Sequence, residues 1–515
     1  MLSSLQHRRA RILLPIFLLA LLAGIAAART PSTAGAPRLR ATRSNTARPN
    51  IIFILTDDQD ALLGSLDVMP AVRNQIAAQG LTFTNAFVPL SLCCPSRSTI
   101  LTGQYAHNHE VYTNVAPDGG FHRFLDLGRE KATVGTAMKN AGYRTALMGK
   151  YLNEYPRGTD KNHVPPGWDE WDVPIGSAGY NQFNYTMNQN GRFVVHGNKA
   201  ADYLTDVLTE RARLFIRDSV ERGSPFFLYV APYAPHRPAT PAPRHALLFP
   251  DAKAPRTASF NEAEINDKPQ SVRKPLLTTE DVGLLDYQYR RRLQSLQAVN
   301  DMVAGIVRTL KNTGQLDNTY IVFTSDNGFH LGQHRMKAGK YTPYEEDIRV
   351  PLVVRGPGVP AGTTTGAFVL NVDFAPTFAE IGGATLGVRA DGRSFLPLLR
   401  GGPEPPGWRK AVFLEQFAFR DAQGEADVDE PSDRTAADGV QEYFTHLGLR
   451  TPAYKYVERA NDEFEYYDLV KDPAELRNIA ARMAPQLRAR LSAIVHALST
   501  CAGAECRRLD AQPIP

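Results

Sequence analysis

Short runs of apolar, β-branched and aromatic residues recur along the chain, and each run ends in polar residues. The four clearest runs cover residues 50–56, 144–148, 225–231 and 319–324. Near-continuous apolar runs of this length are typical of strands that are buried on both faces of a parallel sheet. The pattern therefore predicts a large, mostly parallel central sheet.

Helical patterns lie between these runs. They cover residues 133–141, 201–221 and 279–312, and Gly314 follows the last one as a stop signal. Alternating strands and helices predict an α/β fold with helices on both faces of the sheet. In such folds ligands bind beyond the carboxyl ends of the strands, so polar residues at those ends are the candidates for chemistry.

The pattern changes after about residue 385. Residues 453–457 and 463–469 alternate like an antiparallel strand pair, and a helix is predicted over 473–498. We therefore expect a main domain over 49–385 and a smaller α+β subdomain with an antiparallel sheet over 386–515. The polar, acidic residues 418–440 are typical of a mobile loop.

The N-terminus has the three parts of a secretory signal peptide. Basic residues come first, an apolar run follows, and Ala26, Ala27 and Ala28 fit an A-x-A cleavage site. An uncleaved membrane anchor is the alternative, but the small residues favour cleavage. The sequence thus predicts a signal peptide over 1–28 and a disordered linker over 29–48. The protein would be secreted, either extracellular or periplasmic, or lysosomal if the cell is eukaryotic.

Composition and charge narrow the function only slightly. Apolar residues make up 43% of the 515 residues, enough for a sizeable core. The net charge of +5 falls to 5 − 3 = +2 without the three arginines of residues 1–28, so a nucleic-acid partner is not indicated. Cys501 and Cys506 are expected to pair in an oxidising compartment, two free thiols being the alternative.

Oxygen-bearing side chains follow two of the predicted strands. Asp57 and Asp58 come after the first strand, and Asp326 and Asn327 after the fourth. An all-oxygen set with three carboxylates suits calcium or magnesium rather than zinc. Each pair alone would more often be a turn or a helix cap, but two pairs at strand ends favour a metal site.

Cys93 begins the segment CCPSRSTILTG, in which several residues have specific structural or chemical properties. Pro95 suits the first turn of a helix, whose free amides and dipole attract an anion. A buried cysteine pair or a low-pKa thiol nucleophile is the alternative reading of Cys93 and Cys94.

The segment resembles the sulfatase signature C-x-P-S-R-x-x-x-x-T-G at every fixed position, with Cys94 at a variable one. This resemblance implies an alkaline-phosphatase-like fold and oxidation of Cys93 to Cα-formylglycine by a formylglycine-generating enzyme. One hydroxyl of the hydrated aldehyde would attack sulfur, and the other would later lose its proton and expel sulfate. A serine has no second hydroxyl and would remain trapped as a sulfate ester.

The resemblance also assigns roles to the residues at the strand ends. It implies that one calcium ion lies among Asp57, Asp58, Asp326, Asn327 and the modified Cys93. It implies that Arg97, Lys150 and Lys340 hold the sulfate, whereas His236 protonates the leaving oxygen. Without the resemblance, Arg97 would be read as a surface ion pair, the lysines as solvated charges and His236 as a capping residue.

One position departs from the family pattern. Many sulfatases have a histidine two residues after the lysine matched by Lys150, where this chain has Leu152. His107, His109 and His330 are candidates to replace it. The stretches GKYLNEY, FNYTMNQNG and DYLTDVLTERA resemble the branch of N-acetylglucosamine-6-sulfatases and heparan 6-O-endosulfatases, which implies a 6-O-sulfated glucosamine-type substrate.

Several other functions stay open at this point. One is a broad arylsulfatase acting on aryl sulfates, and another is a catalytically inactive, sugar-binding homologue. A third is a phosphatase or phosphonate monoester hydrolase of the same fold, although such enzymes usually hold two metals with more histidine ligands. The basic run 290–292 is interpreted as a solvated face or a set of structural ion pairs. The oligomeric state is open.

Overall fold

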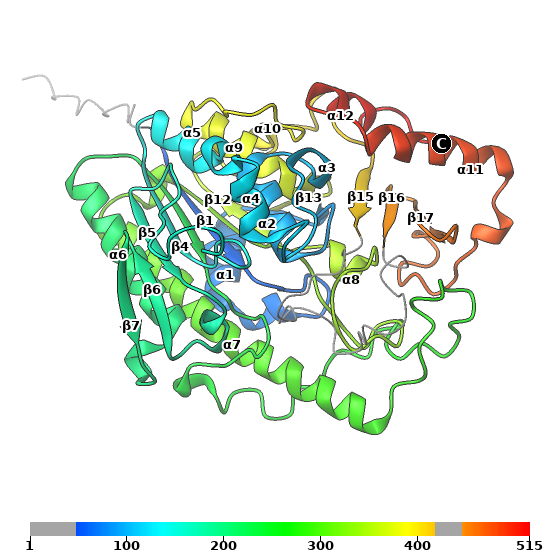
Figure 1. Cartoon of the computed structure of the whole chain (residues 1–515), viewed down its shortest axis with the longest axis horizontal. Coiled ribbons are helices and arrows are strands. Elements are labelled where there is room, and N and C mark those ends of the chain that lie inside the picture. Colours follow the sequence, from blue (N-terminus) through cyan, green and yellow to red (C-terminus); the bar gives the residue numbers. More distant parts are fainter. Residues whose placement is uncertain (1–47, 418–444) are drawn as a thin grey trace, which may run out of the picture. The chain divides into compact units, whose positions relative to one another are not determined.

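A ten-stranded sheet forms the centre of the computed structural model, which describes residues 48–417 and 445–515 (Figure 1). The strand order is β13-β2-β12-β9-β1-β8-β4-β5-β6-β7. The predicted signal peptide, almost all of the predicted linker and the predicted loop 418–440 lie outside the described residues. Within the described part, no helix is long and apolar enough to cross a membrane.

Five neighbouring strands in the middle of the sheet run parallel: β9 (Thr319–Ser325), β1 (Asn50–Thr56), β8 (Phe226–Ala231), β4 (Arg144–Gly149) and β5 (Glu170–Pro174). Every residue of β1, β8 and β9 is buried, as the apolar runs predict. The four predicted strands are therefore confirmed within one or two residues at their ends.

The outer strands are shorter, and the apolar runs did not predict them. They are β12 (Leu352–Arg355), β2 (Leu81–Phe83), β13 (Thr363–Thr365), β6 (Tyr185–Gln189) and β7 (Arg192–His196). Strand β12 is antiparallel to β9, and the β6–β7 hairpin is antiparallel to β5. These strands are short or partly exposed, and β13 and β7 form the edges of the sheet, so they have no continuous apolar run to identify them.

Helices cover both faces of the sheet, as the alternation predicts. Ile52 and Ile54 of β1 belong to the core with helices α6 (Leu204–Glu221) and α7 (Thr279–Asn312). The alternating β1 residues, including Phe53, belong to the opposite core. That second core contains residues of α2 (Cys93–Thr102), α5 (Val134–Asn140) and α9 (Phe374–Gly382).

The remaining described elements are short. The helices are α1 (Pro70–Gln75), α3 (Ala106–His109), α4 (Gly120–Asp126), α8 (Glu345–Ile348), α10 (Leu396–Leu399) and α12 (Ala504–Leu509). Two small sheets pair β3 (Ala86–Phe87) with β14 (Val369–Leu370) and β10 (His330–Leu331) with β11 (Ala338–Gly339).

The long helix α7 has the bounds that its sequence predicts. Thr278 caps it: its Oγ1 accepts from the amide of Asp281 at 3.1 Å, and the Asp281 carboxylate accepts from the amide of Thr278 at 3.0 Å. Gly314, at φ 68°, lies just beyond the C-terminus, where a left-handed backbone ends the helix.

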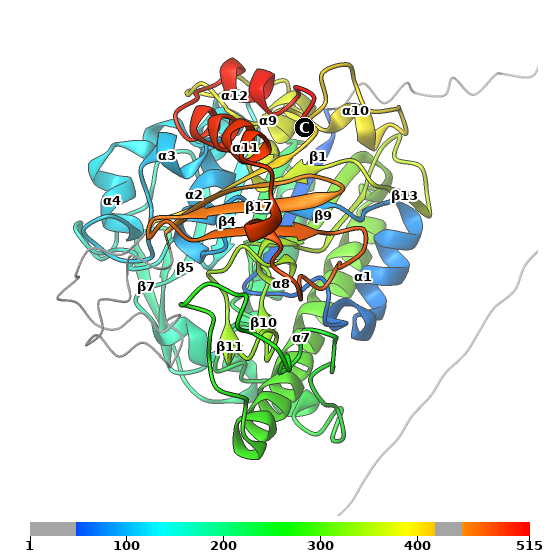
Figure 2. The same ribbon diagram turned by 90° about the vertical axis from the view of Figure 1, so that its right-hand side faces the viewer.

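The C-terminal part contains a four-stranded antiparallel sheet. Its order is β15 (Val412–Gln416), β16 (His446–Arg450), β17 (Tyr454–Arg459) and β18 (Phe464–Asp468). Helix α11 (Pro485–Leu498) packs against it through a shared apolar core (Figure 2). The predicted antiparallel pair is thus confirmed as β17 and β18.

The predicted helix over 473–498 is wrong in its first half, because α11 begins only at Pro485. Upstream, the Asn478 side chain accepts from the amide of Tyr466 and donates to the carbonyl of Phe464, both at 3.0 Å. An asparagine that bonds to a neighbouring backbone in this way competes with helix formation. Proline at the first helical position then starts the helix.

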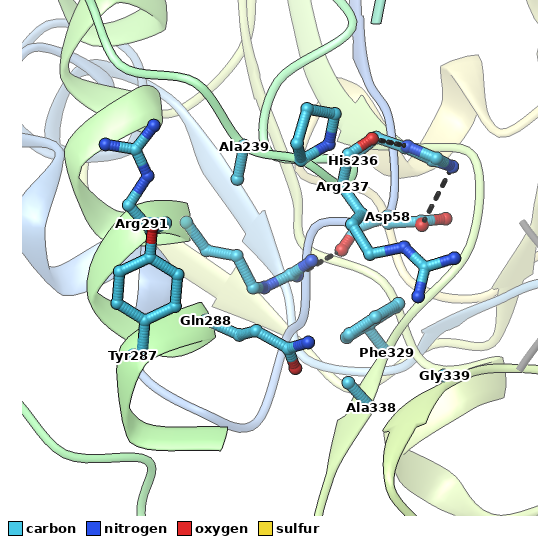
Figure 3. A pocket seen from close by; sticks show the side chains of 12 residues that line it. Asp58, His236, Arg237, Ala239, Tyr287, Gln288, Arg291, Phe329, Ala338 and Gly339 are labelled. Atoms are coloured by element: carbon cyan, nitrogen blue, oxygen red, sulfur yellow. Dashed lines mark hydrogen bonds and ion pairs between the residues drawn. The ribbon is translucent and has the colours of Figure 1, made fainter. Parts of the chain in front are cut away.

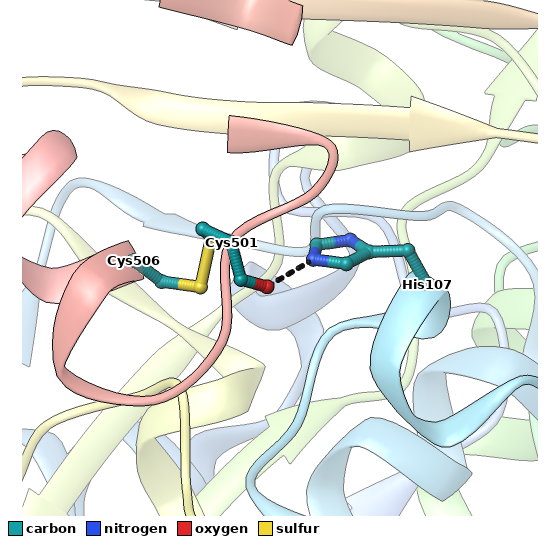
Figure 4. A group of neighbouring side chains, drawn as sticks. All are labelled: His107, Cys501 and Cys506. Carbon is teal, nitrogen blue, oxygen red and sulfur yellow. Dashed lines mark hydrogen bonds between the residues drawn. A yellow bond between two sulfur atoms is a disulfide. The ribbon is translucent and has the colours of Figure 1, made fainter. Parts of the chain in front are cut away.

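Cys501 and Cys506 form a disulfide, as expected (Figure 4). The loop that it closes bonds to the main part of the chain, because His107 and the Asn108 amide both contact the carbonyl oxygen of Cys501. These hydrogen bonds join the disulfide loop to the segment that follows α2.

Candidate active site

The strand ends bring the predicted site residues together. Strands β9, β1, β8 and β4 are parallel neighbours, so their carboxyl ends lie along one edge of the sheet. The residues that follow these ends are Asp326 and Asn327, Asp57 and Asp58, His236, and Lys150. The fold thus collects residues separated by up to 270 positions, as the sheet prediction required.

Cys93 is the first residue of α2 and is buried. Its Sγ lies 3.3 Å from Oδ1 of Asp57, 3.8 Å from Oδ1 of Asp58 and 2.7 Å from Nζ of Lys340. The thiol stands where the oxygen atoms of a modified Cys93 would lie. The positive end of the helix dipole and the lysine both favour negative charge at this atom.

The three carboxylates converge. Four atoms that could bind a metal lie within 4.8 Å of one another: one carboxylate oxygen each of Asp57, Asp58 and Asp326, and Sγ of Cys93. Asn327 donates from Nδ2 to Oδ1 of Asp58 at 2.7 Å, while its buried Oδ1 has no hydrogen-bond partner among the described residues. Three converging carboxylates, with the amide of Asn327 beside Asp58, fit a hard metal ion.

Three buried cations balance the carboxylates. Lys150 contacts both oxygens of Asp57, at 3.0 and 2.9 Å. Arg97 lies 2.9 Å from Asp326 and 3.5 Å from Asp57, and Lys340 lies 2.7 Å from Asp58. These contacts bring Arg97, Lys150 and Lys340 to the site, as predicted, and none of them is a surface ion pair or a solvated charge.

Burial and crowding shape the protonation of these groups. Burial raises the pKa of Asp326 to about 6, and the nearby Asp57 adds to this although Arg97 opposes it. Burial would lower the pKa of Arg97, but Asp326 and Asp57 outweigh it and raise that pKa well above its usual range. Arg97 therefore stays charged, and a divalent cation would relieve the repulsion between the carboxylates.

His236 follows β8 and lies at the edge of the site. Its Nδ1 is 2.6 Å from the carbonyl oxygen of Arg237, and its Nε2 is 3.7 Å from Oδ2 of Asp58. Because a carbonyl only accepts, Nδ1 carries the proton, which leaves Nε2 to exchange a proton with a group in the site. Tyr180 packs against His236, with ring centroids 4.5 Å apart, and lies beneath Nζ of Lys150 at 4.9 Å.

Two site segments have left-handed backbone conformations that non-glycine residues rarely adopt. Asp58 has φ 66°, and Tyr341, next to Lys340, has φ 90°. Bonds on both sides hold Asp58: its amide donates to Oδ1 of Asp326 at 3.0 Å, and its carbonyl accepts from Arg292. Such strain persists where surrounding contacts over-determine the backbone, as they do around Asp58.

Arg292 is a site residue that the sequence reasoning missed. Its guanidinium is buried, lies 4.1 Å above the ring of Phe329 and 3.6 Å from Asp60, and bonds to the backbone of Asp58. The helical spacing could have identified Arg292 as a buried residue, because Arg292 lies on the same buried stripe of α7 as Tyr289 and Leu296. An arginine in an apolar stripe needs a buried partner.

The three histidines considered as replacements at position 152 bond elsewhere. His107 contacts Glu415 at 2.7 Å, His109 contacts Thr99 at 3.0 Å, and His330 contacts Asp347 at 2.8 Å. Burial lowers the pKa of His109 to about 3, so that ring is neutral. Leu152 itself is buried in the core beside the site.

Two pockets flank the site. One is lined by Lys150, Leu152, Tyr180 and neighbouring residues. The other is lined by Asp58 and His236 together with residues of α7 and of the β10–β11 hairpin (Figure 3). A substrate can therefore approach the buried charges from the Lys150 side or from the His236 side.

The sequence comparisons agree on one family. A profile described as Sulfatase matches residues 49–384. The N-acetylglucosamine-6-sulfatase of Homo sapiens is 37% identical over 489 residues, which cover 90% of this chain and 87% of that protein.

Solved structures support the fold. A structure of a protein in complex with its substrate D-glucosamine-2-N,6-O-disulfate has a TM-score of 0.69 and 26% identity, covering 87% of this chain and 97% of that one. The phosphonate monoester hydrolase of Silicibacter pomeroyi has a TM-score of 0.67 at 24% identity, covering 87% and 94%. The second similarity concerns the fold alone.

Proposed function

Since the chain belongs to the sulfatase family and is a sulfatase, we propose that its substrates are sugars of the glucosamine type that carry a 6-O-sulfate. The 37% identity to a human N-acetylglucosamine-6-sulfatase over nine-tenths of the chain supports this substrate. The position of Cys93 is the observation that best supports the sulfatase chemistry. Cys93 begins α2, and its Sγ lies 3.3 Å from Asp57 and 2.7 Å from Lys340.

We propose calcium as the metal. Asp57, Asp58, Asp326 and Asn327 would hold one ion together with the modified Cys93, because hard oxygen ligands suit calcium. When bound, the ion would supply a positive charge that polarises the sulfate. A histidine ligand, which the two-metal phosphatases of this fold commonly use, is not part of this set.

The remaining charges would hold the sulfate and handle protons. After Cys93 is oxidised to formylglycine, its hydrated aldehyde supplies the nucleophile. Arg97 keeps its charge beside Asp326, so it can orient sulfate oxygens throughout the reaction. Lys150 and Lys340 would contact the other oxygens. His236 would give the proton from Nε2 to the leaving sugar oxygen, since its Nδ1–H is held by the carbonyl of Arg237.

We propose that the protein is exported and matured by a formylglycine-generating enzyme. The Cys501–Cys506 disulfide supports an oxidising compartment. The expected signal peptide over residues 1–28 agrees with export. The proposed domain boundary near residue 385 stays a prediction.

The test compares two adjacent cysteines after co-expression with a formylglycine-generating enzyme. The tryptic peptide bearing Cys93 should contain an aldehyde that reacts with hydrazide reagents. Cys93→Ser should lose about 10³-fold or more in activity, whereas Cys94→Ser, at the variable position, should stay near wild type. Full activity with an unmodified Cys93 thiol would overturn the mechanism.

Substrate choice is tested separately by kcat/KM on defined sulfated sugars. N-acetylglucosamine 6-sulfate should be preferred to aryl sulfates and to 2-O- or 4-O-sulfated sugars. The reverse preference would overturn the substrate assignment and leave the sulfatase chemistry intact.

A further inference from the structure

The pocket on the His236 side continues outward from the catalytic charges. Asp58, His236 and Arg237 line one side of it, and Tyr287, Gln288 and Arg291 project from α7 on the other (Figure 3). Three of its lining residues are arginines, whereas Asp58 is the one acidic residue among them, and it belongs to the carboxylate cluster. Arg292 is engaged with Asp60 and with the backbone of Asp58, so on the α7 wall the positive charge of the pocket comes from Arg291.

Two buried polar atoms in this wall have no hydrogen-bond partner among the described residues, Oε1 of Gln288 and Nε of Arg291. Buried polar groups are normally paired, because an unpaired one loses its hydration without compensation. Two such atoms, one an acceptor and one a donor, lie one helical turn apart on the same pocket wall. They indicate a ligand with both an acidic and a hydrogen-donating group.

The three consecutive arginines of α7 have different surroundings. Arg290 bonds to the carbonyl of Ala252 at 3.2 Å, and Arg292 is buried against the backbone of Asp58. Arg291 lines the pocket, and within the described part of the chain it forms no ion pair. Its charge is therefore available to a ligand, whereas the charge of Arg292 serves the backbone of the site.

The chemistry of the reaction places the sugar in this pocket. The group that protonates the leaving oxygen must lie within hydrogen-bond reach of it, so the sugar lies on the side of His236. His236 borders the pocket, and Tyr287, whose side chain is 51% exposed, offers a ring at its rim. Substituents of the sugar beyond the leaving oxygen would then reach the α7 wall.

We propose that this pocket is a subsite for a second anionic group on the substrate, bound by Arg291, while Oε1 of Gln288 accepts from a neighbouring N–H or O–H. The inference rests on the proposed function and deepens it. A planar guanidinium suits the oxygen atoms of a sulfate, a sulfamate or a carboxylate. The preferred substrates are thus sugars with two or more negative charges, rather than singly sulfated N-acetylglucosamine.

The experiment measures kcat/KM of the matured wild-type enzyme and of Arg291→Gln on three substrates. These are N-acetylglucosamine 6-sulfate, glucosamine 2-N,6-O-disulfate, and glucosamine 6-sulfate linked to a uronate. Arg291→Gln should lose about tenfold on a substrate whose second anion occupies the subsite, and less than about twofold on the singly charged sugar. Loss on the disulfate identifies an N-sulfate, and loss on the uronate identifies a carboxylate.

Arg308→Gln is the matched control, because it removes the same charge from an exposed position of the same helix, about 25 Å further along its axis. It should leave all three values unchanged. Equal losses on all three substrates in Arg291→Gln, or no loss on any, would overturn the subsite. If wild type hydrolyses nitrophenyl sulfate but none of the three sugars, the proposed function fails instead.

Discussion

Two buried clusters of charged residues differ in what they leave unpaired. The first is the catalytic cluster of Asp57, Asp58, Asp326, Arg97, Lys150 and Lys340. The second, here called the interface cluster, joins α8 to the C-terminal sheet and contains Glu345, Glu465, Glu475, Arg450, Lys455 and Arg459. In the catalytic cluster the carboxylates converge on one point, whereas in the interface cluster cations separate them.

In the interface cluster, carboxylates form ion pairs with cations of the same cluster. Glu345 lies 3.1 Å from Arg450 and 3.2 Å from Lys455, and Glu465 lies 2.6 Å from Arg459. Burial would raise the pKa of Glu345, but Lys455 and Arg450 outweigh it and lower that pKa to about 2. Burial raises the pKa of Glu475 to about 7, although Lys455 opposes it.

A buried charge cluster can bind a ligand when its like charges face one another without a cation between them. Around Asp326 the carboxylates repel one another, and Oδ1 of Asn327 has no partner among the described residues, so the cluster favours the entry of a cation. In the interface cluster, cations of the chain already neutralise Glu345 and Glu465, so this cluster supports structure. Lys455 also donates to the carbonyl of Pro343, which lies three residues along the chain from Lys340.

The largest expected effect is in the catalytic cluster. Asp326→Asn removes one of the three converging carboxylates, so activity should fall by about 10³-fold. The same change should abolish the rise in Tm that calcium produces in the wild type. Steady-state rates and thermal unfolding with and without calcium measure both. Full activity of the wild type after exhaustive chelation would show that the carboxylates do not serve a metal.

The next effect is in the interface cluster and concerns stability. Arg459→Met leaves Glu465 buried without its cation, which should cost about 3–5 kcal/mol of unfolding free energy. The calcium response and kcat per folded molecule should stay near wild type. Denaturant unfolding measures the loss, and the double variant with Glu465→Gln should recover part of it. A loss of the calcium response in Arg459→Met would break the distinction between the clusters.

The smallest effect is a pH dependence beside the disulfide loop. Burial disfavours the charged form of His107, but Glu415, at 2.7 Å, outweighs it and raises the pKa of His107 to about 8. Because this folded-state pKa lies above the unfolded value of about 6.5, the pair stabilises the protein fully below pH 6.5. That contribution, about 2 kcal/mol, should disappear as the pH rises through 8.

Unfolding free energies of wild type and His107→Gln across pH 6 to 9 measure this contribution. The difference between the two proteins should shrink as the pH rises. A constant difference would mean that His107 acts through packing and neutral hydrogen bonds, such as its contact with the carbonyl of Cys501.

Much of the fold and of the catalytic cluster could be predicted from local signals. The apolar run of β1 and the cap and stop of α7 identify those elements without knowledge of their neighbours. The CCPSR segment, the Asp57-Asp58 pair and the Asp326-Asn327 pair at strand ends identified the candidate site. The short strands β2 and β12 escaped, because pairing with neighbours rather than their own pattern makes them strands.

The positions of the buried strands, the long helix and the motif around Cys93 follow from the sequence alone, since these depend on residues close together in the chain. The surroundings of Arg291 and Arg292 and the pairs of the interface cluster become visible only in the tertiary structure. Arg292 meets Asp58 across 234 positions, and Arg450 meets Glu345 across 105. The sequence around a charged residue does not show whether its partner is water or a buried group far away in the chain. That partner is set by the tertiary fold, because a buried charge needs a partner that folding brings to it.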